Sequence, residues 1–254
     1  MDTNLEPGAE PARRVVVVTG ASRGLGAGMA ARFAARGLRL GLVARTEPAT
    51  PPGAEALTAA VDVTDAAAVD RFCAAVVERF GRIDLWVNNA GLLEPIAPVR
   101  EADPAALARN VEVNVVGVLH GCAAFARHVR GRPGDGVLVS ITSGAATTPY
   151  AGWAAYCGSK AAVDMITRVV AVEEADAGLR ALAVAPGVVD TDMQAAIRAT
   201  PADRFPAVDR FLARKRDEAF NSPEWVADHI LRLAFDPAAA PGDVVVRLPA
   251  EARR

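Results

Sequence analysis

The chain has 254 residues, of which 52% are hydrophobic and 23% are charged, and its formal net charge is -2. This length and apolar content suit one α/β domain with a large buried core. A net charge so near zero creates no strong positive electrostatic potential, which argues against nucleic acid or a membrane surface as partner. Three cysteines without metal-ligand spacing predict a reduced, cytoplasmic protein with no metal site: Cys73, Cys122 and Cys157.

The start of the chain is polar and carries Pro7, Gly8 and Pro11. It lacks the apolar centre of a signal peptide, so residues 1–13 are expected to be a disordered leader. One domain is expected at residues 14–250. No apolar run reaches the roughly eighteen residues that a membrane-spanning helix needs.

A strand, a glycine-rich turn and a helix open the domain. The uninterrupted run Val15–Val18 is typical of a buried parallel strand, and a helical pattern runs from about residue 25 to 36. Glycines between such elements let the backbone approach a pyrophosphate, which the helix N-terminus would bind. The spacing is G-x-x-x-G-x-G, and the predicted dinucleotide contacts are Gly20, Ser22, Arg23, Gly24, Leu25 and Gly26.

The segment Gly20–Gly24 also fits G-x-S-x-G, the nucleophile elbow of α/β hydrolases. Only nineteen residues precede Gly20, whereas an elbow serine normally follows several strands, and no HGGG-like oxyanion segment is present. All three histidines sit within helical patterns: His120, His128 and His229. His229 could serve as a late triad base, but helix-surface roles are the better interpretation.

The second strand, expected at Arg39–Ala44, informs the choice of cofactor. It ends without the acid that binds the ribose 2'-hydroxyl in NAD enzymes, and Arg45 follows it. Arg45 and Arg23 together suit a 2'-phosphate, so NADP(H) is the predicted cofactor, with Glu47 assumed to point away. Two prolines and a glycine near residue 52 predict that the crossover at 46–57 is a loop.

The remaining pattern alternates strands and helices. Further helices are expected near 65–80, 103–129, 154–175 and 223–235, with Thr64 as cap of the first and Ser222 opening the last. This alternation predicts a single Rossmann domain with a doubly wound, mostly parallel, seven-stranded sheet and helices on both faces. The other strands are expected at Thr58–Val61, Leu85–Asn88, Val137–Ile141, Ala181–Ala185 and Val244–Leu248.

Tyr156 and Lys160 are four residues apart and therefore share one helix face. A phenol can protonate a carbonyl oxygen if its pKa falls from about 10 toward neutrality, and a nearby ammonium favours the phenolate. Ser143, just after an apolar strand, offers a hydroxyl to the same oxygen. A Tyr-x-x-x-Lys pair is also typical of a solvated helix face, but its place after a nucleotide-binding turn favours catalysis.

Together these motifs resemble the short-chain dehydrogenase/reductase family. They occur in that family's order: Thr19–Gly26, Asn88-Asn89-Ala90-Gly91, Asn114, Ser143, Tyr156, Lys160 and Pro186-Gly187 followed by Thr191. The stretches Gly152–Cys157, Lys160–Met165 and Ala185–Gln194 are similar to the sepiapterin reductase and benzil reductase branch. That branch reduces carbonyls, often of vicinal diketones, with NADPH.

The resemblance implies roles for individual residues. Ser143 would bind the substrate oxygen, Tyr156 would donate the proton, and Lys160 would bind the nicotinamide ribose. Asn114 would sit at a backbone bend that holds a water beside Lys160 and completes a proton relay, although it could equally be only a polar kink in a helix. Thr191 would bind the nicotinamide carboxamide, although it could equally cap a helix. The other implied cofactor contacts are Asp62, Val63, Asn89, Ala90, Gly91, Pro186, Gly187 and Val189. A homodimer or homotetramer is also implied.

The substrate is expected to be a small carbonyl compound that contacts Leu93, Trp153 and Met193, although Trp153 could equally be a core or interface aromatic. No acid occurs between Asp243 and Glu251, where a sepiapterin reductase holds its pterin with an aspartate. This departure favours a benzil-like or other hydrophobic diketone.

Several alternatives stay open. Arg247 could select an anionic substrate. The chain could also be an NADP-dependent alcohol dehydrogenase, a sepiapterin-type reductase or, in a different class, a non-catalytic NADP-binding regulator. The intact set of Ser143, Tyr156 and Lys160 argues against the regulator.

Overall fold

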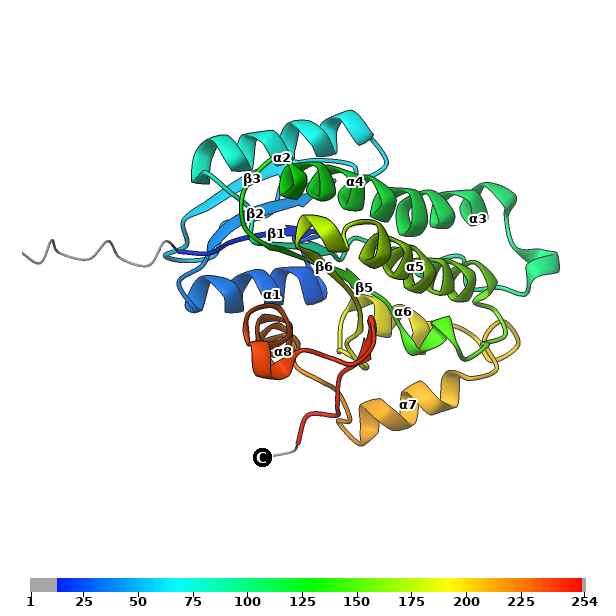
Figure 1. Cartoon of the computed structure of the whole chain (residues 1–254). Coiled ribbons are helices and arrows are strands. Elements are labelled where there is room, and N and C mark those ends of the chain that lie inside the picture. Colours follow the sequence, from blue (N-terminus) through cyan, green and yellow to red (C-terminus); the bar gives the residue numbers. More distant parts are fainter. Residues whose placement is uncertain (1–12, 253–254) are drawn as a thin grey trace, which may run out of the picture.

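The computed structural model describes residues 13–252, so the expected leader at 1–13 lies outside the described residues apart from Arg13 (Figure 1). Within that range seven strands form one sheet in the order β3-β2-β1-β4-β5-β6-β7, and every neighbouring pair is parallel. The strands are β1 Val15–Thr19, β2 Arg39–Ala44, β3 Ala56–Ala60, β4 Leu85–Asn88, β5 Gly136–Ile141, β6 Leu179–Ala185 and β7 Val245–Arg247.

Helices cover both faces of this sheet (Figure 1). One core cluster joins the sheet to α1 and α8 through Phe33 and Ile230, and a second joins the opposite face to α2, α4 and α5 through Phe72, Phe125 and Val163. The doubly wound Rossmann fold is thereby confirmed. The α-helices are α1 Gly24–Ala35, α2 Ala66–Phe80, α3 Pro104–Val111, α4 Gly117–Arg130, α5 Ala154–Glu173, α6 Asp192–Ala199, α7 Val208–Arg216 and α8 Pro223–Phe235.

The strand order reverses between β1 and β4, because β2 and β3 lie on one side of β1 and the later strands lie on the other. In open α/β sheets, ligands bind in the crevice beyond the carboxyl ends of the strands at such a switch point. The glycine turn after β1 and the asparagines after β4 meet there.

Some predicted elements differ from those observed. The crossover after β2 is a loop, as expected, but β3 begins two residues earlier than the predicted Thr58. The helix expected at 103–129 is divided by a π-helical segment, Glu112–Val116. Asp65, not Thr64, caps α2 by accepting from the backbone N–H of Ala68 at 2.9 Å. Helices α6 and α7 were not among the predicted elements.

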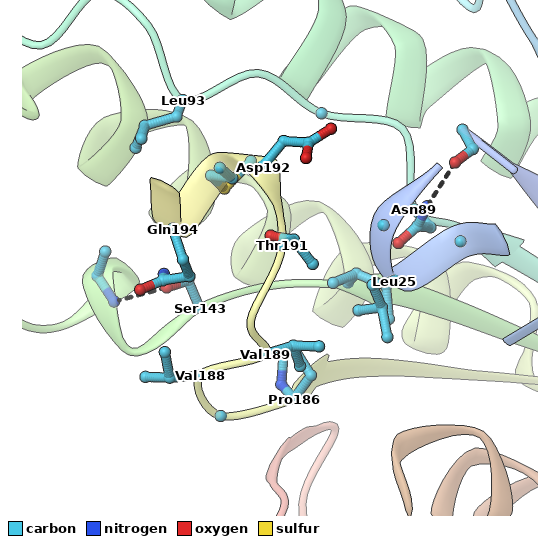
Figure 2. A pocket seen from close by; sticks show the side chains of 18 of the residues that line it. Leu25, Asn89, Leu93, Ser143, Pro186, Val188, Val189, Thr191, Asp192 and Gln194 are labelled. Atoms are coloured by element: carbon cyan, nitrogen blue, oxygen red, sulfur yellow. Dashed lines mark hydrogen bonds between the residues drawn. The ribbon is translucent and has the colours of Figure 1, made fainter. Parts of the chain in front are cut away.

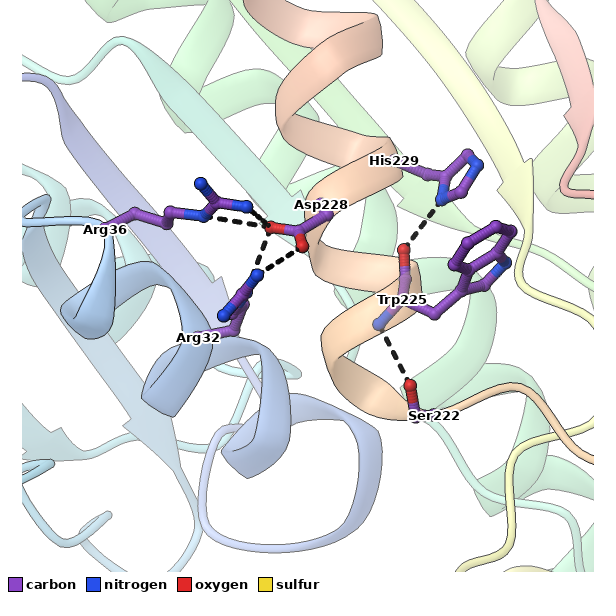
Figure 3. A network of polar contacts seen from close by, with 6 residues as sticks. All are labelled: Arg32, Arg36, Ser222, Trp225, Asp228 and His229. Atoms are coloured by element: carbon purple, nitrogen blue, oxygen red, sulfur yellow. Dashed lines mark hydrogen bonds and ion pairs between the residues drawn. The ribbon is translucent and has the colours of Figure 1, made fainter. Parts of the chain in front are cut away.

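Helices α1 and α8 are joined by an ion-pair cluster around Asp228 (Figure 3). Its carboxylate accepts from Arg32 Nη2 at 2.6 Å and from Arg36 Nη2 at 2.9 Å. The Ser222 hydroxyl accepts from Trp225 N at 3.1 Å, which is the expected cap of α8. These contacts fix α8 beside the helix that follows the glycine turn.

Candidate active site

The glycine turn has a shape that only glycine permits. Gly20 and Gly24 have φ values of 67° and 56°, in the left-handed region that favours glycine. A Cβ on Gly20 would lie 2.7 Å from Cα of Ala90, and a Cβ on Gly26 would collide with the Gly20 carbonyl oxygen. Bare backbone therefore faces the cavity at the N-terminus of α1, whose first turn carries no acid. The cradle fits a pyrophosphate.

Asn89 ties the end of β4 to this turn. Its Nδ2 donates to the carbonyl oxygens of Thr19 at 2.9 Å and Gly20 at 3.2 Å, and its backbone N–H donates to Thr19 Oγ1 at 3.0 Å. The backbone N–H of Ala90 donates to the same hydroxyl at 3.1 Å. Asn89 thus holds two strand ends in register, and Asn89, Ala90 and Gly91 all line the cavity.

Two arginines line the cavity where the predicted 2'-phosphate would lie. Arg45 follows β2, and Arg23 precedes α1, where its exposed side chain pairs with Asp192 at 3.6 Å. Glu47 is not among the cavity residues, and it accepts from Thr58 Oγ1 at 2.6 Å. No acid from β2 therefore competes with the two guanidiniums.

Asp62 and Val63 line the cavity after β3. Burial raises the pKa of Asp62, but hydrogen bonds from Thr64 and Arg109 outweigh it and lower the pKa below its usual value. Arg109 Nη2 donates to Asp62 Oδ2 at 2.7 Å. Asp62 is therefore a charged part of the cavity wall, and its contact with the cofactor stays a prediction.

The hydrolase alternative has no base in this cavity. His229 Nδ1 contacts the Trp225 carbonyl oxygen at 2.8 Å on α8 (Figure 3). His120 Nδ1 contacts the Val63 carbonyl oxygen, and His128 accepts from a backbone N–H. None of the three histidines lines the cavity that contains Ser22, so the elbow would lack its general base.

Asn114 occupies the π-helical segment and is fully buried. Its Oδ1 accepts from Leu92 N at 2.7 Å, and its Nδ2 donates to Leu92 O at 2.7 Å and to Ser159 Oγ at 3.1 Å. A Cβ built on Gly91 would lie 3.3 Å from Asn114 Oδ1 and 3.8 Å from Lys160 Nζ. The two polar groups therefore flank one glycine, although Asn114 itself does not line the cavity.

Ser143, Tyr156 and Lys160 come together at the end of β5. Lys160 Nζ donates to the Ile141 carbonyl oxygen at 2.8 Å and lies 5.7 Å from the centre of the Tyr156 ring. Ser143 Oγ accepts from Ala145 N at 3.2 Å, which fixes the position of its oxygen, and its hydroxyl hydrogen can donate. All three catalytic candidates line the same cavity.

The electrostatics of this group correct one expectation. The sequence analysis expected Lys160 to lower the Tyr156 pKa, but burial instead raises the pKa of the phenol, opposed in part by hydrogen bonding with Ser143. Burial also lowers the pKa of Lys160 to about 8, against a raising effect of Asp164. Tyr156 is therefore protonated, as a proton donor must be, but the raised pKa makes its phenol a weaker acid than an ordinary tyrosine.

The loop after β6 forms the opposite wall. Gly187 has a φ of 78°, and a Cβ there would lie 2.7 Å from Asn221 Nδ2. Asn221 Nδ2 donates to the Pro186 carbonyl oxygen at 2.8 Å, so it holds this loop. Thr191 is the N-cap residue of α6, but its side chain makes no capping hydrogen bond. This favours a contact of the Thr191 side chain with a ligand over a role as helix cap. Pro186, Gly187, Val189 and Thr191 all line the cavity.

The cavity has a volume of about 1530 Å³, larger than the roughly 300–1,000 Å³ of ordinary small-molecule pockets. Figure 2 shows Leu25 and Asn89 at one end and Leu93 and Gln194 at the other. An apolar cluster forms part of the second end. Its core includes Leu93, Trp153 and Phe205, with the Trp153 and Phe205 rings stacked 4.5 Å apart, and Met193 packs against it. A dinucleotide and a substrate can share this space.

Every predicted site residue except Asn114 lines this one cavity. The residues that the sequence analysis missed are Asn221, Asn110, Gln194 and the cavity-facing residues Phe211 and Arg214 of α7. The spacing of Phe211 and Leu212, which lie three and four residues after Val208, is the sequence signal for α7. For Asn110, the Asn-x-x-x-Asn spacing to Asn114 is the signal, and its Nδ2 donates to the Glu94 carbonyl oxygen at 2.8 Å.

Comparisons with known proteins agree with this architecture. Residues 14–202 match the family model of short chain dehydrogenases. Benzil reductase ((S)-benzoin forming) of Bacillus cereus is 32% identical over 244 residues, covering 91% of this chain and 98% of that protein. 3beta-hydroxysteroid dehydrogenase 1 of Eggerthella lenta is 34% identical over 235 residues, covering 89% of this chain and 88% of that protein.

A solved structure agrees as well. The crystal structure of the KRED1-Pglu enzyme superimposes with a TM-score of 0.82 at 34% identity, covering 92% of this chain and all of that one (100%). The chain belongs to the short-chain dehydrogenase/reductase family. It is an oxidoreductase that acts on a carbonyl or alcohol group with a nicotinamide cofactor.

Proposed function

We propose that this protein is an NADPH-dependent carbonyl reductase whose substrate is a hydrophobic, benzil-like diketone, reduced to a hydroxy ketone or alcohol. The observation that carries the proposal is the meeting of Ser143, Tyr156 and Lys160 in a cavity with an apolar, aromatic end. Similarity to a benzil reductase over 91% of the chain supports the choice of substrate class.

The cofactor would lie along the cavity from the glycine turn toward Ser143. Gly20, Gly24 and Gly26 leave room for its pyrophosphate, and the absence of an acid after β2 leaves Arg23 and Arg45 to pair with a 2'-phosphate. When bound, NADPH supplies the hydride that reduces the carbonyl carbon. The preference for NADPH over NADH rests on these two arginines.

The chain's own residues would handle the proton. Ser143 donates a hydrogen bond from its hydroxyl group to the substrate oxygen, since its own oxygen already accepts from Ala145 N. Tyr156, which is protonated at neutral pH as any tyrosine of ordinary pKa is, gives its proton to the same oxygen as the carbonyl becomes an alcohol. Lys160 uses one N–H on the Ile141 carbonyl, which leaves two donors for ribose hydroxyls.

A homo-oligomer forms part of the proposal. Three apolar side chains on one face of α5 are exposed: Met165 by 61%, Val169 by 45% and Val172 by 81%. Their spacing of four and three residues makes a continuous stripe along the helix. Burial of this stripe against a second copy would remove it from water.

The test is an assay of purified protein with NADPH or NADH and a panel that includes benzil, a simple ketone and sepiapterin. Loss of absorbance at the reduced nicotinamide band is expected with NADPH and benzil, with slower turnover of the other acceptors. Tight NADPH binding without turnover of any acceptor would instead favour a regulatory protein. Turnover of alcohols alone would favour a dehydrogenase.

A further inference from the structure

The side-chain oxygen of Gln194 has no hydrogen-bond partner among residues 13–252. Gln194 lies in the first turn of α6, is 9% exposed and lines the cavity. Its Oε1 is buried without a hydrogen bond, and none is formed by either amide atom among residues 13–252. Buried polar groups in folded proteins are nearly always paired, so an amide left unpaired at a cavity wall calls for an explanation.

Gln194 lies on α6 between Met193, which packs against an apolar core cluster, and Ile197, which belongs to that cluster. The neighbouring core cluster is apolar and contains Leu93 and Ile197, each 1% exposed. Trp153 Nε1 is likewise buried without a partner on the same cavity. An apolar pocket with a few well-placed polar groups is typical of a small-molecule site in which those groups set orientation and specificity.

We propose that Gln194 determines substrate specificity by hydrogen-bonding a second oxygen on the carbon next to the reacting carbonyl. The inference rests on the proposed reductase function and deepens it. In Figure 2 the Gln194 side chain extends from α6 toward the loop that carries Ser143, the group expected to hold the reacting oxygen. The amide recognises a neighbouring oxygen there.

The amide suits both the substrate and the product of a diketone reduction. An amide carries two N–H donors and a carbonyl acceptor. It can donate to the second carbonyl of a vicinal diketone and, after rotation about its terminal bond, accept from a hydroxyl in that position. A substrate with a single carbonyl would leave the buried amide without a hydrogen bond. Sites that hydrogen-bond a substrate group discriminate strongly against analogues that lack that group.

The test compares benzil with deoxybenzoin, which has the same two phenyl rings but only one carbonyl. The readout is the ratio of kcat/KM for benzil to that for deoxybenzoin with NADPH. In Gln194→Leu this ratio is expected to fall at least about tenfold from its wild-type value. Comparing the ratios between proteins cancels the greater intrinsic reactivity of the diketone.

Two further variants support this experiment. Gln194→Met, an unbranched apolar replacement, gives the same test if the leucine variant fails to fold, as judged by NADPH binding and thermal unfolding. Ala195→Gln places an amide on the exposed side of α6, away from the cavity, and is expected to leave the ratio unchanged.

The outcomes separate the two proposals. If the unsubstituted protein reduces neither ketone, the reductase function fails and this inference fails with it. If it reduces both and the ratio in the Gln194 variants stays within about twofold of wild type, only the role of Gln194 is overturned, because one lost hydrogen bond should exceed that.

Discussion

The Lys160 ammonium donates to the carbonyl oxygen of Ile141 at 2.8 Å. Ile141 is the last residue of β5 and lies two residues before Ser143. This bond joins the helix that carries Tyr156 to the strand end that carries the serine. The sheet, through one backbone carbonyl, thus sets the position of the catalytic candidates relative to one another.

Tyr156→Phe removes the proposed proton donor while keeping the ring. We expect kcat to fall by about 10²–10⁴-fold, the usual contribution of general acid catalysis, with NADPH affinity nearly unchanged. Steady-state kinetics and fluorescence titration with NADPH measure the two quantities. Tyr150→Phe, at the only other tyrosine, should have the smaller effect on kcat, and equal turnover in Tyr156→Phe would refute the assignment.

The lowered pKa of Lys160 predicts a pH dependence of stability. The folded protein releases this proton near pH 8, whereas the unfolded chain keeps it to about the ordinary value of 10.5. Since the unfolded state binds more protons in that window, the free energy of unfolding should rise with pH there. Urea unfolding without cofactor, compared with Lys160→Met, measures this. The prediction would be contradicted if the free energies of unfolding of the wild type and of Lys160→Met differed by the same amount at every pH from 8 upward.

Arg45→Ala tests the choice of cofactor. Loss of a hydrogen bond to a charged phosphate costs about 1.5–3 kcal/mol, which is roughly ten- to a hundredfold in kcat/KM for NADPH. The value for NADH should change far less, because NADH lacks the 2'-phosphate. Arg71→Ala, on the exposed side of α2, is the charge-matched control. Equal losses with both cofactors would show that Arg45 does not read the phosphate.

Gly187→Ala tests the loop that Asn221 holds. A left-handed backbone costs a residue with a Cβ about 1–2 kcal/mol, and this Cβ would also lie 2.7 Å from Asn221 Nδ2. Gly37→Ala is a matched control, since Gly37 has a φ of 76° but open space around a Cβ. We expect Gly187→Ala to lower the free energy of unfolding more than Gly37→Ala in chemical denaturation. Equal losses would mean that the Asn221 contact relaxes without cost.

Val169→Glu tests the exposed stripe on α5. Sedimentation should show the wild type as a dimer or tetramer, with the variant shifted toward smaller species because a carboxylate would be buried in the interface. Leu212→Glu, at a residue on α7 with the same 45% exposure, serves as control. A monomeric wild type, or equal behaviour of the two variants, would remove α5 as the interface.

Most of the fold was predictable because its signals are local. The four valines of β1, the glycines of the turn and the Tyr-x-x-x-Lys pair each specify structure within a few residues. An irregularity of the helix at Asn114 was predicted, as a polar kink or a backbone bend, but its π-helical form was not. It depends on Asn114, whose amide bonds Leu92 and Ser159, residues distant in sequence that only the folded chain brings together.

The substrate end of the cavity was the least predictable part. Leu93, Trp153 and Met193 were expected to contribute because they adjoin recognisable motifs, but Phe211 belongs to a helix that carries no motif. Gln194 stood within a recognised stretch, yet its importance follows from the lack of a hydrogen-bond partner. Such a lack is visible only when every surrounding group has been placed.

The most direct test of hydride transfer to a carbonyl uses NADPH that carries deuterium at the transferable position of the nicotinamide. The purified protein is incubated with this cofactor and benzil, and the product is analysed by mass spectrometry and proton NMR. The account predicts a hydroxy ketone with one deuterium on the carbinol carbon. A reduced product without deuterium there, or no reduced product at all, would contradict it.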